Sequence, residues 1–72
     1  MDIKEKLNIL ENLLDVEQDT LREKTELDQL TEWDSIASIT TIAMFDSMFK
    51  KQLTPEEVKE FKTIKDITDK MG

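Results

Sequence analysis

The sequence contains neither cysteine nor histidine among its 72 residues. Without cysteine the chain can form no disulfide, no thiolate metal site and no cysteine nucleophile. Without histidine it lacks the most common general base, the most common zinc ligand and every catalytic triad that depends on histidine. No acidic stretch has the spacing of an EF-hand loop. These absences disfavour a self-sufficient enzyme, and no metal site is expected.

Glycine occurs only at Gly72 and proline only at Pro55. Because these residues are the strongest breakers of regular structure, few sites could separate strands, and an all-α fold is expected. A chain of this length forms one small domain, so residues 1–72 are expected to be a single domain with a small core. The first residues do not resemble a signal peptide and no apolar run reaches membrane-spanning length, so we expect a cytoplasmic protein.

The whole chain has a net charge of −7, and its acidic residues are concentrated in one part of the sequence. Residues 11–34 hold nine acidic side chains against two basic ones, whereas residues 35–49 hold a single charge, Asp46. A negative surface repels nucleic acid and anionic membranes and attracts basic protein patches. We therefore expect protein partners, no nucleic-acid or membrane partner, and a monomer. The alternative is that the acids only keep a small domain soluble.

Residues 3–15 are predicted to form the first of four helices. Asp2 followed by Glu5 has the spacing of a capping box at its start. Apolar residues then recur at three-to-four spacing, which is typical of one buried helix face: Ile3, Leu7, Leu10 and Leu14.

Residues 16–33 show no sustained period and are expected to form a long connection. Thr20 and Glu23 have the spacing to cap one short turn within it. Its isolated apolar residues are expected to anchor it to the core: Val16, Leu21, Leu27 and Leu30.

Residues 34–49 are predicted to form the central helix. Asp34 can cap its start, and Lys50 and Lys51 follow its end, where cations suit the helix dipole. Apolar residues recur along it at three-or-four spacing: Ile36, Ile39, Ile42, Phe45 and Phe49.

Two short helices are predicted in the last third of the chain. Thr54 as a cap, Pro55 at the first helical position and Glu57 predict a helix over residues 55–60. Thr63 with Asp66 predicts the start of a fourth helix, whose inner face carries Ile64, Ile67 and Met71.

Ser35 is the residue best placed to take part in a chemical reaction. If Asp34 caps the central helix, Ser35 is its first residue, where unpaired N–H groups and the positive end of the helix dipole suit an attached phosphate. The neighbouring sequence offers no base to activate the hydroxyl, so Ser35 is expected to accept a modification rather than to act as a nucleophile with its own machinery. A serine present only for helix-start geometry is the alternative.

These features together resemble the acyl carrier protein family over nearly the whole chain. Asp34-Ser35-Ile36 stands in the position of the family's Asp-Ser-Leu motif at the start of the second helix. The form Trp33-Asp34-Ser35 is similar to stand-alone carriers of specialised pathways. Further similarities lie in the second half of the chain, at Phe49, Leu53, Pro55, Glu56, Glu57, Phe61, Thr63, Ile64 and Ile67. The resemblance predicts a small four-helix bundle of acyl-carrier type with a long loop between helices 1 and 2.

The resemblance implies that Ser35 accepts 4′-phosphopantetheine from coenzyme A through a separate, Mg²⁺-dependent phosphopantetheinyl transferase. The thiol of that group would carry acyl intermediates as thioesters between enzymes of fatty acid, polyketide or a more specialised biosynthesis. Asp34 and Ile36 would flank the attachment site. The surface facing loading and transferring enzymes with basic patches would include Ile36, Ile39, Met44 and Asp46. Two alternatives stay open: an aminoacyl, peptidyl or D-alanyl carrier, and an unmodified acidic helical interaction module.

Several side chains have competing expected roles. Trp33 is expected to anchor the connection, with stacking on the prosthetic group as the alternative. Ala37, Thr40 and Met48 occupy positions that are often acidic in the family, so the partner-facing surface is expected to differ. A stripe of Met44, Met48, Thr41 and Ala37 is either a partner contact or the edge of the core. An ordinary core or an acyl tunnel would be formed by Ile39, Ile42, Phe45, Phe49, Val58, Phe61, Ile64 and Ile67.

Overall fold

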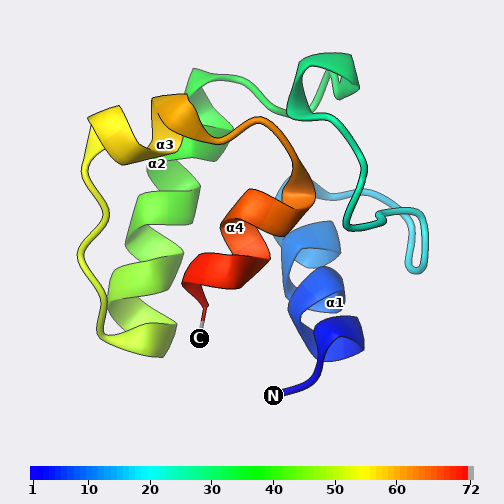
Figure 1. Ribbon diagram of the computed structural model, residues 1–72, viewed down its shortest axis with the longest axis horizontal. Helices are drawn as coiled ribbons and strands as arrows, with labels where there is room; N and C mark the ends of the chain where they lie inside the picture. The colour runs from blue at the N-terminus through cyan, green and yellow to red at the C-terminus, as the bar shows by residue number, and fades with distance from the viewer. Residues whose placement is uncertain (72) are drawn as a thin grey trace.

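The computed structural model describes residues 1–71, which fold into four α-helices and two shorter helical segments, with no strand among them (Figure 1). The α-helices are α1 (Ile3–Leu14), α2 (Ser35–Met44), α3 (Pro55–Glu60) and α4 (Ile64–Lys70). The short segments are η1 (Leu27–Gln29), a 3₁₀ turn, and η2 (Phe45–Phe49), a π-helical turn that continues α2. The predicted all-α class is confirmed.

All four α-helices begin after the predicted cap residues, which are Asp2, Asp34, Thr54 and Thr63. The Asp2 carboxylate accepts the backbone N–H of Glu5 at 2.9 Å, and the Asp34 carboxylate accepts that of Ala37 at 2.9 Å. The Thr54 hydroxyl accepts the N–H of Glu57 at 3.2 Å, with Pro55 at the first helical position. Each cap satisfies an N–H that has no acceptor inside its helix.

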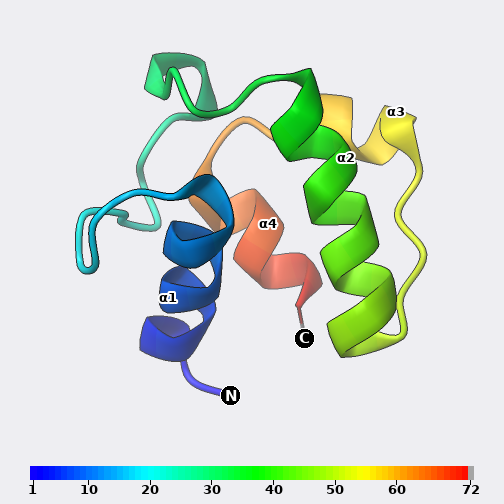
Figure 2. The same ribbon diagram turned by 180° about the vertical axis from the view of Figure 1, so that it is seen from behind.

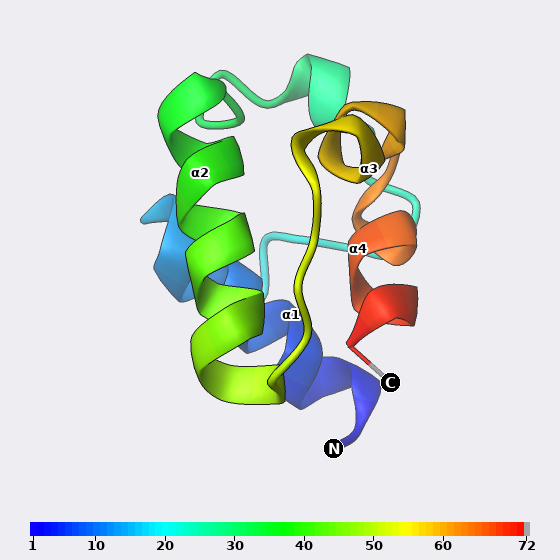
Figure 3. The ribbon, with the colours of Figure 1, turned by 90° about the vertical axis from the view of Figure 1, so that its left-hand side faces the viewer.

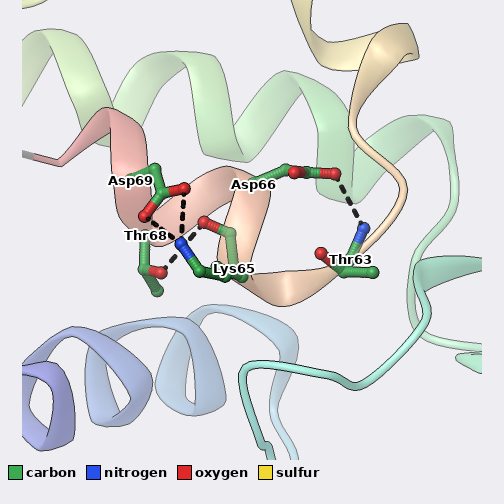
Figure 4. Close-up of polar contacts among 5 residues, drawn as sticks. All are labelled: Thr63, Lys65, Asp66, Thr68 and Asp69. Carbon is green, nitrogen blue, oxygen red and sulfur yellow. Dashed lines mark hydrogen bonds and ion pairs between the residues drawn. The ribbon is translucent and has the colours of Figure 1, made fainter.

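The start of α4 is also fixed by a carboxylate, as Figure 4 shows for Thr63 and Asp66. Asp66 accepts the backbone N–H groups of Lys62 at 2.8 Å and Thr63 at 3.1 Å. These two bonds stabilise the charged carboxylate and hold the pKa of Asp66 below its usual value. Within α4, Lys65 Nζ lies 3.1 and 2.9 Å from the two carboxylate oxygens of Asp69. This hydrogen-bonded ion pair raises the pKa of Lys65.

The helices pack so that α2 contacts both α1 and α3, while α1 also contacts α4. Figures 1 and 2 show the two termini at one end of the molecule, together with the end of η2, and the start of α2 at the opposite end. The core between the helices is built from large side chains that are almost completely buried, including Leu10, Phe45, Ile64 and Ile67. Burial of this kind is the main source of stability in so small a domain.

The connection between α1 and α2 is held to the core by side chains and by backbone. Leu21 and Leu27 are buried and Leu30 is half-buried, so the predicted anchoring is confirmed. The connection also pairs with the start of α4 through its backbone, which the sequence did not predict. Three N–H groups donate to backbone carbonyl oxygens at 2.9 Å: Leu27 to Lys62, Ile64 to Thr25 and Lys65 to Glu23. These bonds order the connection well before it reaches Ser35.

The predicted cap at Thr20 and Glu23 is wrong. The Thr20 hydroxyl donates backwards to the carbonyl oxygen of Glu17 at 2.6 Å, and no helix follows it. The nearby turn is instead closed by Thr25, whose hydroxyl accepts the N–H of Arg22 at 2.9 Å. A short polar side chain has several backbone partners within reach, and here the preceding carbonyl is the one it bonds.

Glu11 is buried on α1, although the sequence places it within the acidic segment. Its side chain is only 2% exposed, and one carboxylate oxygen accepts the backbone N–H of Leu21 at 3.0 Å. Among the described residues the other oxygen has no hydrogen-bond partner. Glu11 therefore ties α1 to the connection rather than adding to the acidic surface.

Candidate functional site

Ser35 is the first residue of α2 and is exposed. The residues before it are fixed: Trp33 is half-buried against the core and donates its N–H to the carbonyl of Leu30 at 3.1 Å. Asp34 uses a carboxylate oxygen to cap the N–H of Ala37. The predicted anchoring role of Trp33 agrees with this packing, and the local structure presents the Ser35 hydroxyl on the surface at a defined place.

The start of α2 favours negative charge beside Ser35. The first intrahelical bond runs from the N–H of Ser38 to the carbonyl of Asp34 at 3.0 Å. The N–H groups of Ser35 and Ile36 precede it, so neither has an acceptor within the helix. These two N–H groups and the helix dipole favour phosphate oxygens at Ser35, next to the Asp34 carboxylate that caps the N–H of Ala37.

An apolar cavity of about 210 Å³ opens beside Ser35, between α2 and α3. Figure 3 shows the two helices side by side at this end of the molecule. The cavity is lined by Ser35, Ser38, Ile39, Ile42, Pro55, Val58 and Lys59. A second hollow of about 360 Å³ shares Ile39 and Ile42 and extends along α2 to Leu53. Ser35 and α3 line the first cavity and not the second, and we call the first cavity the α2–α3 groove.

Seven of the eight residues predicted to form an ordinary core or an acyl tunnel are buried or packed against the core, and Ile39 is the exception. Ile39, Ile42 and Val58 line the α2–α3 groove. Ile39 is 67% exposed, so its prediction as an ordinary core residue is wrong. The residues that are buried or packed against the core are Ile42, Phe45, Phe49, Val58, Phe61, Ile64 and Ile67.

The predicted partner-facing residues are only partly on the surface. Ile36, Ile39 and Asp46 are exposed, whereas Met44 is half-buried and packs against the core. Ala37 is only 7% exposed, so its expected place on a partner-facing surface is wrong. Thr41 is also buried, with its hydroxyl donating to the Ala37 carbonyl at 2.8 Å. The predicted stripe therefore does not form one surface, although Met48 at its end is exposed.

Three residues that line the groove escaped the sequence prediction: Ser38 of α2, and Pro55 and Lys59 of α3. Pro55 and Lys59 of α3 line the groove because α3 packs against α2 close to Ser35. The sequence analysis uses Pro55 as a helix-start signal and as part of the family resemblance, but not as a site residue. No local pattern distinguishes Lys59 from the other lysines of the last third of the chain, since its place depends on the packing of two helices.

Comparisons with known proteins found no match for this chain among family models, curated proteins or solved structures. In residues 1–71 no group of three or more acidic side chains is placed to hold a metal ion. Over the same residues, none of the helices combines the length and the apolar character needed to span a bilayer.

Proposed function

We propose that this chain is an acyl carrier protein and that Ser35 is the attachment site of 4′-phosphopantetheine. The observation that carries the proposal is the position of Ser35: an exposed first residue of a capped helix, in the lining of an apolar groove. The order of the helices, with residues 15–34 joining α1 to α2, supports a small four-helix bundle of acyl-carrier type with a long loop.

The residues present fit this group. The exposed hydroxyl of Ser35 is open to a transferase, and the free N–H groups at the start of α2 favour the phosphate that attachment leaves there. In that step a bond forms between Ser35 Oγ and the phosphorus that bears the pantetheine, and adenosine 3′,5′-bisphosphate leaves coenzyme A. The hydroxyl proton passes to a base of the Mg²⁺-dependent transferase, since this chain supplies none beside Ser35.

Each neighbouring side chain has a role in the proposed carrier. When bound, the group supplies a terminal thiol that holds an acyl chain as a thioester. Ile39, Ile42 and Val58 line an apolar groove that shields such a chain from water. Asp34 holds the start of α2, and therefore Ser35, in place through its cap. We infer a cytoplasmic monomer that meets a transferase and acyl-loading and acyl-transferring enzymes with basic patches.

The apolar groove also ranks the alternatives. An aminoacyl, peptidyl or D-alanyl carrier would use the same Ser35, but an apolar groove suits an aliphatic chain better than a charged amine. An unmodified interaction module would need no groove beside a serine, although the exposed isoleucines of α2 are compatible with it.

The test is the intact mass of the protein after incubation with coenzyme A, Mg²⁺ and a broad-specificity phosphopantetheinyl transferase. The wild type should gain the mass of one phosphopantetheine group and Ser35→Ala should gain none. Ser47→Ala is the matched control, because Ser47 is exposed and lies in η2 at the far end of the same helical stretch. An unmodified wild type, or a modified Ser35→Ala protein with native circular dichroism, contradicts the proposal.

A further inference from the structure

We propose that the end of the molecule opposite Ser35 is a docking surface for an acidic segment of a partner protein that also carries apolar side chains. This inference goes beyond the proposed carrier function, because it concerns a different surface and needs no modification of Ser35. We call the surface the basic end, and it comprises Ile3, Lys4, Met48, Lys50 and Lys51.

Exposed apolar side chains gather at the basic end. Of the five large apolar side chains that are exposed in residues 1–71, three lie at the start of α1 or in η2: Met1 at 63%, Ile3 at 40% and Met48 at 52%. Figures 1 and 2 show the start of α1, the end of η2 and the end of α4 together at this end of the molecule. Scattered single exposures are ordinary, whereas several at one place mark an interaction site. The flexible side chain of Met48 suits such a surface, because methionine adapts its shape to a partner.

The basic end also carries lysines without an acidic partner among the described residues. Lys4, Lys50 and Lys51 are exposed. Within residues 1–71, the ion pairs shorter than or equal to 4.0 Å involve other lysines. Lys51 Nζ donates to the backbone carbonyl oxygen of Lys70 at 2.7 Å, which places Lys51 beside the end of α4 and leaves its charge uncompensated. An acidic segment of a partner supplies the complementary charges.

The net charge of −7 does not describe this end of the molecule. Residues 26–34 lead into α2, and Figures 1 and 2 show this part of the connection at the opposite end. The two longest extents of the molecule are 26 and 25 Å, whereas charges in solution are screened over about 8 Å at physiological ionic strength. A partner at the basic end therefore responds mainly to the lysines close to it.

A protein segment fits the basic end better than an anionic membrane or a second copy does. The exposed acids Glu5 and Asp46 stand close in sequence to the lysines, and a uniformly anionic surface would repel both. A protein can instead place its acids opposite the lysines alone. A second copy offers its acidic connection, but Leu21 and Leu27 of that connection are buried, so it would bring charge without apolar surface to cover Met48.

The experiment uses the unmodified protein and a synthetic probe, an amphipathic helical peptide with leucines along one face and glutamates at its flanks. Binding is followed by amide chemical shifts in two-dimensional NMR and by titration calorimetry. Wild type should bind with shifts concentrated in residues 3–5 and 46–51. Ile3→Ser with Met48→Ser should bind about tenfold more weakly, because two large apolar side chains no longer leave water on binding. A peptide with serines in place of the leucines should bind weakly to both proteins.

Lys50→Glu should bind the leucine peptide about three- to fivefold more weakly, since an exposed charge pair is replaced by a repulsive one. Lys24→Glu is the matched control, because Lys24 is an exposed lysine of the connection and the change in net charge is the same; it should bind as wild type does.

Equal weakening by Lys50→Glu and Lys24→Glu, or shifts concentrated in residues 35–43, overturns the proposal. Sedimentation of the wild type with vesicles of phosphatidylcholine and phosphatidylserine, without binding of the peptide, overturns it in favour of a membrane. A wild-type dimer in sedimentation equilibrium that Lys50→Glu does not form overturns it in favour of a second copy. None of these outcomes depends on whether Ser35 accepts phosphopantetheine.

Discussion

Replacing the buried Glu11 with leucine should loosen the connection that leads to Ser35 and destabilise the whole domain. The Glu11 carboxylate accepts the N–H of Leu21 at 3.0 Å, and both residues are almost completely buried. In Glu11→Leu the side chain keeps a similar size but loses its acceptor. The Leu21 N–H is then buried without a partner and without access to water.

The size of the effect follows from two opposing contributions. A buried donor left without an acceptor costs about 1–3 kcal/mol. Part of this is offset, because the variant no longer buries a carboxylate whose second oxygen has no partner. We expect a net loss of about 1–2 kcal/mol in the free energy of unfolding. That is a large share of the roughly 4–11 kcal/mol expected for a domain of this length. Glu11→Gln keeps an acceptor oxygen and should stay within about 1 kcal/mol of wild type.

The assay is urea denaturation followed by Trp33 fluorescence and by circular dichroism. With a slope of about 1 kcal/mol per M urea, the midpoint of Glu11→Leu should fall by about 1–2 M. Asn12→Leu is the control for adding a leucine to α1, because Asn12 is exposed, and it should change stability by no more than about 0.5 kcal/mol. A Glu11→Leu midpoint equal to wild type refutes the reasoning. A Glu11→Gln protein as unstable as Glu11→Leu shows that the charge matters and not the acceptor.

Two further predictions concern α4 and α3. Asp66→Ala should cost about 1 kcal/mol at neutral pH through loss of the cap. Because the pKa of Asp66 is lowered in the folded protein, its contribution is present above the unfolded value of 3.8 and lost as the pH falls through the folded value. The urea midpoints of wild type and variant should therefore differ at neutral pH and become equal in acid, below the folded pKa of Asp66. In hydrogen exchange, α3 should open before α2, since its six residues cannot persist as a helix alone. Equal or greater protection of the α3 amides contradicts this.

The helix starts could be predicted from sequence because capping is local. Asp34 lies three residues before the N–H that it caps, and Thr54 does the same, so each signal lies within one turn of the chain. The pairing of residues 23–27 with residues 62–65 has no such signal. It joins segments almost forty residues apart through backbone groups, which every sequence supplies.

The orientation of α2 was harder to predict, because the helix is apolar or weakly polar around its whole circumference. Hydrophobic spacing selected the stripe that contains Ile36 and Ile39, yet both isoleucines are exposed. The buried face includes Thr41, whose hydroxyl is satisfied by a backbone carbonyl and so can enter the core at little cost. Periodicity could therefore locate the helix, the position of Ser35 and the inward placement of Ile42, Phe45 and Phe49, but not the exposure of Ile36 and Ile39.

The exposed isoleucines of α2 are not explained by the stability of the fold. A domain of this size has few apolar side chains to bury, yet it leaves Ile36 and Ile39 in water while it buries Glu11 and Thr41. If folding alone decided their placement, isoleucine would gain more than threonine from a place in the core. Ser35 lies beside Ile36 at the start of the same helix, so a protein that covered the outward face of α2 would bring its own groups within reach of the Ser35 hydroxyl. The proposed attachment site therefore lies on the same exposed surface as the two isoleucines.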